Sequence, residues 1–214
     1  MSYQVPAFAE ALKEMRKQGK ERKFLESVEL MVALRDMNLK DPSQRFNIEV
    51  LIPNPIKREI KIGLFADGDL AVQAENAGFT VIGSDQFDQI AKNPKDAKRM
   101  AEEHDFFLAI GKFMPRVGRF LGKILGPRGK MPKPIQPTAD VNEIKTNYAK
   151  TIRLRLRENP CVNTRIGTLE NSDDEIAENA VAALASLTGK LVHGQQNIKK
   201  VFVKTTMGPA IKVE

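Results

Sequence analysis

KIGLFADGDLAVQAENAGFTVIG, residues 61–83, contains two short apolar runs with a turn and an amphipathic stretch between them. A third apolar run, DFFLAIG at 105–111, follows two more stretches with helical spacing. Short apolar strands that alternate with helices of roughly ten residues are typical of βαβ units and a parallel sheet. We therefore expect a small α/β domain from about residue 61 to about residue 150.

The sequence before this region has a different pattern. Apolar residues recur at helical spacing over residues 5–15, which predicts an amphipathic helix that ends at Gly19. ESVELMVAL predicts a strand over residues 29–34. Residues 46–52 alternate with period two, and Pro53 follows them, so we expect a second strand there.

The sequence after this region adds a strand, a helix and a hairpin. Residues 152–157 alternate between apolar residues and arginines, which predicts one apolar face and one arginine face. A solvated edge strand explains those arginines as well as a binding strand does. Ser172 and Glu175 form a capping box before a helix that Gly189 ends. The strands on either side of residues 207–209 are expected to form a closing hairpin or a bent strand pair.

Composition narrows the class of protein. The 214 residues fit one large domain or two small ones and carry a net charge of +7, which favours a polyanionic partner, nucleic acid before membrane. A chain with one cysteine, Cys161, cannot form an internal disulfide. The two histidines, His104 and His193, do not have the spacing of metal ligands, so we expect no metal and no cofactor. No apolar run reaches the roughly 18–20 residues of a membrane span, and no signal peptide is evident, so we expect a cytoplasmic protein.

The net charge is concentrated in GKFMPRVGRFLGKILGPRGKMPKP, residues 111–134, which contains seven cations and no acid. We expect a short helix around residues 119–124 and a loop over GPRGKMPKP, because glycine and proline break regular elements. A nucleotide-binding P-loop fails on spacing, since Ile124 stands where its first glycine belongs and Met131 where its hydroxyl belongs. A solvated basic loop without a partner stays open. The cations are Lys112, Arg116, Arg119, Lys123, Arg128, Lys130 and Lys133.

Two short segments at the ends of the chain are candidates for contact with RNA. KTTMGPA at 204–210 combines a hydroxyl, a glycine and a proline at a turn, although an ordinary strand connection has the same composition. Phe24 follows Arg22 and Lys23, although a single phenylalanine is usually part of a core. Only 6% of residues are aromatic, so recognition of a folded RNA by shape fits better than stacking of single bases.

Several motifs together resemble one family. ILGPRGKMPKP at 124–134 and VKTTMGPAIKV at 203–213 resemble the ribosomal protein L-one family of the large subunit, in its archaeal form. RKFLESVEL at 22–30, EHDFFLA at 103–109 and RIGTLENSDDEIAENAVAAL at 165–184 match as well. The resemblance covers the whole chain.

The resemblance implies a fold of two domains, one α/β and one α+β. A discontinuous α+β domain is formed by both chain ends, residues 1–58 and 153–214, and it binds RNA. A Rossmann-like α/β three-layer domain, residues 59–152, is inserted between them. Two connections permit hinge motion between such domains.

The resemblance also implies a function. The family is a structural constituent of the large ribosomal subunit and no enzyme. It binds large-subunit rRNA at a mobile stalk near the tRNA exit site, assists release of deacylated tRNA and represses its own mRNA through the leader. We expect a monomer when the protein is free. The implied RNA-binding residues are Phe24, Ser27, Glu29, Arg157, Thr206, Met207 and Gly208, with an accessory basic loop of Arg119, Lys123, Arg128, Lys130 and Lys133.

The alternative from another class is a small nucleotide-binding α/β enzyme that uses the inserted region. Asp67, Asp69 and Asp85 lie near predicted strand ends, but aspartate is common in such turns. No pair of a nucleophile and a base is evident in the sequence.

Overall fold

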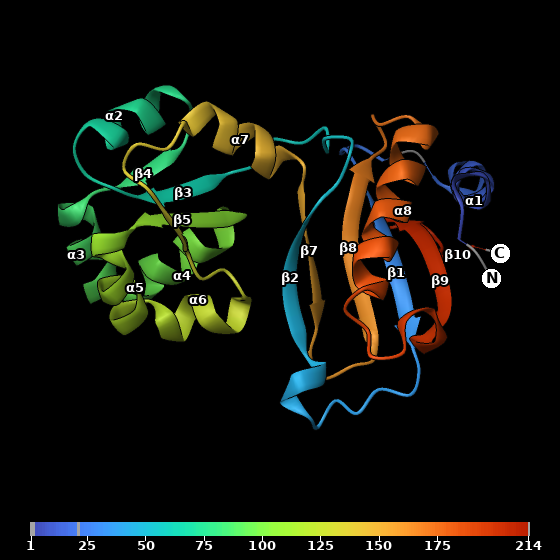
Figure 1. Cartoon of the computed structure of the whole chain (residues 1–214). Helices are drawn as coiled ribbons and strands as arrows, with labels where there is room; N and C mark the ends of the chain where they lie inside the picture. Colours follow the sequence, from blue (N-terminus) through green and yellow to red (C-terminus); the bar gives the residue numbers. More distant parts are fainter. Residues whose placement is uncertain (1–2, 21, 214) are drawn as a thin grey trace. The chain divides into compact units, whose positions relative to one another are not determined.

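The chain forms two compact units in a computed structural model that describes residues 3–20 and 22–213 (Figure 1). Unit 1 comprises Met1–Arg58 and Ala149–Glu214, and unit 2 comprises Glu59–Tyr148. The chain therefore returns to unit 1 at Ala149, four residues before the boundary at residue 153 that the resemblance implies. The boundary is earlier because strand β7 (Thr151–Leu156) begins before Arg153 and pairs within unit 1.

A four-stranded antiparallel sheet forms the centre of unit 1, in the order β10-β9-β1-β8. Its strands are β1 (Ser27–Leu34), β8 (Cys161–Thr168), β9 (Ile198–Thr205) and β10 (Ile211–Lys212). Exposure alternates along β1, so that Val28, Leu30 and Val32 face the core. The opposite side of the sheet carries Glu29 and Met31, and we call it the outer face. Of the two arrangements predicted for the last two strands, the structure has the antiparallel hairpin.

Two amphipathic helices pack on the buried face of this sheet. Helix α1 (Val5–Gln18) contacts β9 and α8 (Asp173–Thr188), and α8 contacts β8. The capping box is confirmed, because the Ser172 hydroxyl accepts the Glu175 N–H at 3.2 Å and the Glu175 carboxylate accepts the Ser172 N–H at 3.0 Å. Gly19 and Gly189 end the two helices as predicted. The helices and the sheet thus share one apolar core.

A second, two-stranded sheet in unit 1 joins β2 (Phe46–Leu51) to β7. Their register places Arg153 opposite Glu49, and the two side chains form an ion pair at 3.2 Å. The apolar side of β7 lies in the core, as the alternation predicted. At least this arginine therefore pairs within the fold. Short 3-10 helices, η1 (Pro42–Gln44) and η3 (Gly194–Asn197), precede β2 and β9.

The chain leaves and re-enters unit 1 at neighbouring points. Ile52 N–H donates to the Lys150 carbonyl at 2.8 Å, and Ile56 N–H donates to the Ala149 carbonyl at 3.3 Å. Side chains of α8 hold the outgoing segment as well, since Asn179 accepts the Asn54 N–H at 2.9 Å and donates to the Asn54 carbonyl at 3.1 Å. The outgoing chain is therefore part of unit 1 as far as about residue 57.

Unit 2 is a parallel sheet in the order β4-β3-β5-β6, with helices on both of its faces (Figure 1). This three-layer α/β arrangement confirms the predicted fold class. The strands are β3 (Ile62–Phe65), β4 (Thr80–Ile82), β5 (Phe106–Ile110) and β6 (Lys133–Ile135). The helices are α2 (Asp69–Asn76), α3 (Ser84–Lys92), α4 (Pro94–Glu103), η2 (Gly111–Phe113), α5 (Met114–Phe120), α6 (Gly122–Arg128) and α7 (Val141–Ala149).

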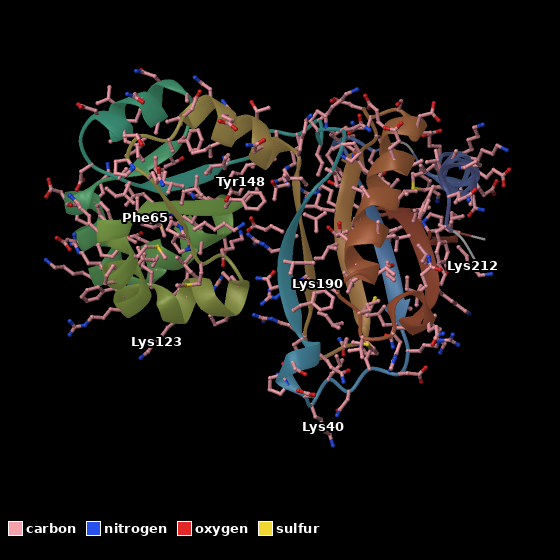
Figure 2. All side chains as sticks on the ribbon, viewed as in Figure 1. Lys40, Phe65, Lys123, Tyr148, Lys190 and Lys212 are labelled. Atoms are coloured by element: carbon pink, nitrogen blue, oxygen red, sulfur yellow. The ribbon has the colours of Figure 1, made fainter. Side chains whose placement is uncertain are left out.

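Phenylalanine rings fill the core of unit 2. Phe65 is fully buried (Figure 2), and its ring centroid lies 5.9 Å from that of Phe87, 5.9 Å from that of Phe107 and 6.4 Å from that of Phe113. The few aromatic residues of the chain are thus used largely for packing. An exposed phenylalanine such as Phe24 stands out against this pattern.

The expected loop over GPRGKMPKP is wrong in part. Residues 126–128 form the last turn of α6, and residues 133–134 begin β6. Gly129 has a φ of 67°, which lets its N–H reach the Gly126 carbonyl at 2.9 Å while the Lys130 N–H reaches Leu125 at 3.0 Å. These two bonds form a Schellman motif, which ends the helix three residues later than the first glycine suggests.

Candidate nucleic-acid interface

Two segments that are far apart in the sequence, residues 24–29 and 204–208, meet at one end of the sheet in unit 1. The Thr206 N–H donates to the Ser27 carbonyl at 3.0 Å, and the Ser27 N–H donates to the Thr206 hydroxyl oxygen at 3.2 Å. These bonds continue the β1–β9 ladder past its last paired residues. The structure therefore brings together six of the seven residues that the resemblance implied: Phe24, Ser27, Glu29, Thr206, Met207 and Gly208.

The two hydroxyl groups at this junction have different surroundings. The Thr206 hydroxyl is held by main-chain groups of Ser27, since it also lies 3.4 Å from the Ser27 carbonyl. The Ser27 hydroxyl has no hydrogen bond to any residue that the structure describes. Ser27 thus has a hydroxyl free for a ligand, whereas Thr206 joins the two segments.

The buried carboxylate of Glu26 holds the turn at Met207 in place. Glu26 is only 2% exposed, and its Oε1 accepts the Met207 N–H at 2.8 Å. The main chain of Glu26 also accepts the Leu169 N–H at 3.1 Å. Sequence reasoning missed this residue, because an acid just before a strand gives no signal of burial. The hydrogen bond from Met207 to Glu26 therefore fixes the position of Met207 relative to residues 24–27.

Gly208 is required by close packing within the turn. Its N–H donates to the Thr205 carbonyl at 3.2 Å, and a Cβ at this position would lie 2.4 Å from the Thr205 Oγ1. That Oγ1 is buried and has no hydrogen-bond partner among the described residues. A side chain at position 208 therefore displaces Thr205 or opens the turn.

Large apolar side chains are exposed at this junction. Phe24 is 52% exposed, Leu25 44% and Met207 61%, and these are three of the eight large apolar residues that are exposed in the described chain. Apolar groups at the rim of a polar site exclude water and strengthen the hydrogen bonds beneath them. The clustering is the feature expected of a binding surface rather than of scattered exposure.

Cations surround the apolar side chains. Lys20, Arg22 and Lys23 are exposed in the segment that leads to Phe24. On the outer face, Glu29 pairs in register with Lys204 on β9 and with Arg165 on β8. One acid between two cations leaves the end of the sheet positive.

Arg157 lies elsewhere. It follows β7, and the same connection brings the Pro160 carbonyl to the Leu34 N–H at 2.8 Å. Leu34 is the last residue of β1, whereas Ser27 is the first, so the two ends are separated by roughly 23 Å at ~3.3 Å per residue. The structure does not bring Arg157 together with the other six residues.

The accessory basic loop belongs to unit 2, and its cations differ in their surroundings. The Lys130 ammonium donates to the carbonyls of Ala101 and His104, at 2.8 and 2.6 Å, where α4 ends. Arg128 forms an ion pair with Glu102 at 2.9 Å. The remaining three, Arg119, Lys123 and Lys133, are exposed, and Lys123 extends away from α6 (Figure 2).

These contacts give the GPRGK motif, residues 126–130, a structural role in unit 2. Lys130 supplies positive charge and hydrogen bonds to the carbonyl end of a helix, where both are favourable. Gly129 ends α6 and directs Lys130 towards α4. The GPRGK sequence is therefore largely a folding motif of unit 2.

The crevice that binds ligands in many α/β folds is occupied by side chains of the protein itself. In a sheet of this order the crevice lies between the loops that follow β3 and β5. Lys112, after β5, forms an ion pair with Asp67, after β3, at 2.8 Å. Asp67 also accepts the N–H and the hydroxyl of Ser84 at 2.9 and 2.7 Å. The hydrogen bond from Lys112, followed by those from Ser84, lowers the pKa of Asp67 to about 2.

This arrangement is unfavourable for a nucleotide. A cavity of about 650 Å³ adjoins the Asp67 carboxylate, but Asp69, Glu75 and Asp85 line it as well. The carboxylate already accepts the N–H at the start of α3, where a phosphate would bind. The cavity would therefore repel a phosphate group.

Comparison with known proteins defines the family. The sequence profile of the Ribosomal protein L1p/L10e family matches residues 12–209. The protein called "Large ribosomal subunit protein uL1" is 42% identical in Pyrococcus horikoshii, over the whole of this chain and 98% of that one. The protein of the same name is 41% identical in Thermococcus kodakarensis, over the whole of both chains, and 38% identical in Methanocaldococcus jannaschii, over 97% of this chain and 95% of that one. The chain belongs to the Ribosomal protein L1p/L10e family, whose members are structural proteins and not enzymes.

The structure also bears on membrane association. In residues 3–20 and 22–213, every helix is too short or too polar to cross a bilayer.

Proposed function

We propose that this protein is a structural constituent of the large ribosomal subunit in the cytoplasm, and that unit 1 binds large-subunit rRNA. The residues in contact are Phe24, Ser27, Glu29, Thr206, Met207 and Gly208. The observation that carries this proposal is the junction of residues 24–29 with residues 204–208 by hydrogen bonds. It is supported by the name of the archaeal relatives.

The chemistry of the junction suits a folded RNA. The free Ser27 hydroxyl and the Glu29 carboxylate can bond base edges and 2′-hydroxyl groups, and the 2′-hydroxyl groups distinguish RNA from DNA. Lys20, Arg22, Lys23 and Lys204 supply the phosphate attraction that gives affinity without sequence information. Phe24 and Met207 pack against sugars and bases and exclude water from the polar contacts.

We extend the proposal to the position and regulation of this complex. The rRNA site is a mobile stalk near the tRNA exit site, and the protein assists release of deacylated tRNA there. We assign the contact with that tRNA to Arg119, Lys123 and Lys133 of unit 2, which are exposed. The same junction binds a similar structure in the leader of the protein's own mRNA and represses its translation. The free protein is a monomer.

The test is binding to an rRNA stalk fragment at fixed salt. Thr206→Ala leaves the Ser27 N–H unsatisfied and loosens the junction, so we expect a loss of about 1–3 kcal/mol. Ser27→Ala removes only the free hydroxyl, and we expect a smaller loss of about 0.5–1.5 kcal/mol. Ser186→Ala on α8 is the matched control and should have no effect. Unchanged affinity of both junction variants would overturn the proposal.

A thermal-shift experiment separates this function from the nucleotide-binding alternative. Any ligand that binds only the folded state raises the melting temperature, and the rise grows with the ratio of the ligand concentration to Kd. The rRNA fragment should raise it, whereas ATP, GTP and NAD should not. A shift with a nucleotide alone would favour the alternative.

A further inference from the structure

A pair of neighbouring lysines lies at the opposite end of the sheet from the junction. On β1, Ala33 pairs with Lys200 and Leu34 pairs with Ile198, so Lys199 is the extra residue of a β-bulge in β9. Lys199 and Lys200 are exposed, whereas Ile198 and Val201 on either side are buried. Bulges are often found where a sheet re-aims a side chain. Here the bulge exposes two cations in succession.

Both cations are available to a ligand. Neither Lys199 nor Lys200 has an ion pair or side-chain hydrogen bond with any described residue. Lys200 lies on the outer face, in the same row of β9 as Phe202 and Lys204. Lys199 lines a surface cavity of about 380 Å³ together with Arg35, Gln195 and Gln196, and with Tyr3 and Ile198 on its apolar side.

Arg35 reinforces the positive charge. Its Nε donates to the Gln196 carbonyl at 2.7 Å, which holds the guanidinium beside the cavity. Asp36 is the acid next to it, at 3.9 Å and well exposed, so the pair is weak in water. The cavity therefore offers cations and amide groups, which are the groups that bind phosphate and sugar.

The position of this surface relative to the junction suggests its partner. Lys200 and Lys204 share one strand and one face, and they are separated by roughly 13 Å at ~3.3 Å per residue. Thr206 and Lys199 are separated by roughly 23 Å on the same scale. A rigid helical stem that leaves the junction along β9 would present phosphates over this whole distance.

We propose that Lys199, Lys200 and Arg35, at the end of the sheet opposite the junction, form a second contact with the phosphate backbone of the same RNA, on a stem that extends from the junction along the outer face to this end. This inference rests on the proposed function and adds a second contact surface to it. The contact is with phosphates only and does not distinguish one base from another. It fixes the direction in which the stem leaves unit 1 and supplies salt-dependent affinity.

The experiment measures affinity for the rRNA stalk fragment at several salt concentrations. The double variant K199Q/K200Q removes two phosphate contacts, so the slope of log K against log salt should become shallower by about 0.7–0.9 for each. The accompanying loss of affinity should then shrink about sevenfold or more between 50 and 200 mM salt. K199R/K200R keeps the charges and should restore the slope.

Matched variants distinguish the two proposals. K13Q/K17Q makes the same change of charge on exposed positions of α1 and should leave the slope nearly unchanged. Ser27→Ala should lower affinity without changing the slope. If K199Q/K200Q leaves the slope unchanged while Ser27→Ala weakens binding, the second contact is overturned and the junction stands. If neither variant affects binding, the proposed function fails as well.

The length of the RNA gives an independent check. On a fragment shortened to less than roughly 20 Å of stem, K199Q/K200Q should lose its effect, whereas Ser27→Ala should keep its effect. An equal effect on the short and the long fragment would overturn the direction that we propose for the stem. Binding of an acidic protein by wild-type protein but not by K199Q/K200Q, with no change in RNA binding, would assign the surface to a protein partner instead.

Discussion

The ammonium group of Lys112 lies 2.8 Å from a carboxylate oxygen of Asp67, and this pair joins the loops that follow the two central strands of unit 2. The pair lies where open α/β sheets commonly bind their ligands. Unit 2 thus has the architecture of a nucleotide-binding domain with its crevice closed by its own side chains. The same pair makes the stability of unit 2 depend on pH.

The pKa of Asp67, lowered to about 2, sets the range of that dependence. In the unfolded chain the carboxyl titrates near ~3.9, so between these values the unfolded state binds the proton more readily. The stabilisation is therefore complete above about pH 4 and is lost as the pH falls towards 2. Asp67→Asn should melt at a lower temperature than the wild type at pH 6, and the difference should vanish near pH 2. A difference that stays constant over this range would contradict the prediction.

Gly208→Ala should weaken RNA binding, because its Cβ would lie 2.4 Å from the Thr205 Oγ1 and force the turn open. We expect at least a tenfold loss in affinity for the rRNA fragment, on the order of 1.4 kcal/mol. Thr205→Ala removes the obstructing atom, which has no described partner, so Thr205→Ala/Gly208→Ala should recover most of the affinity. Absence of rescue would show that glycine is needed for direct approach of the RNA rather than for packing.

Glu26→Ala should lower RNA affinity although Glu26 does not reach the surface. The change leaves the Met207 N–H without its acceptor, and such a loss costs about 1–3 kcal/mol. Glu26→Gln keeps an oxygen that can accept the same bond, so this variant should bind nearly as the wild type does. Equal losses in both variants would indicate that the charge itself matters.

Lys130→Met should destabilise unit 2 and leave binding of the rRNA fragment unchanged. The ammonium bonds to Ala101 and His104 are lost, which we expect to cost about 1–2 kcal/mol. Lys123→Met is the matched control on the same basic segment, and its exposed side chain should contribute less than about 0.5 kcal/mol. Thermal melting and the binding assay together check both variants. A large loss of rRNA affinity in Lys130→Met would place the RNA site on unit 2.

Elements with strong local patterns could be predicted from the sequence. The alternation of residues 46–52, the capping box at Ser172 and the apolar runs of unit 2 all correspond to observed elements. Local sequence determines these features because each depends on contacts a few residues apart. The predicted end of α6 was wrong. The helix was expected to stop before Gly126, but Gly129 and not Gly126 adopts the left-handed conformation that ends it.

The candidate site was predictable only in part. The motifs pointed to residues 24–29 and 206–208. That these two segments lie next to each other depends on the register of β1 with β9. The connection after β7, which meets the far end of β1 at Leu34, separates Arg157 from them, and no motif in the sequence indicates this separation. The burial of Glu26 and the contacts of Lys130 arise from packing between segments that are remote in sequence.

The hydrogen bond between Ile56 and Ala149 has a consequence for protein engineering. Because the two places where unit 2 is attached already lie side by side, residues 59–148 can be excised and replaced by a short glycine-serine bridge. Closing so short a loop costs little entropy, and the excision divides no strand or helix except α7, whose last residue, Ala149, stays with unit 1. The result is a minimal module of roughly three-fifths of the length that carries the whole junction, and the same two positions can accept another domain as an insertion.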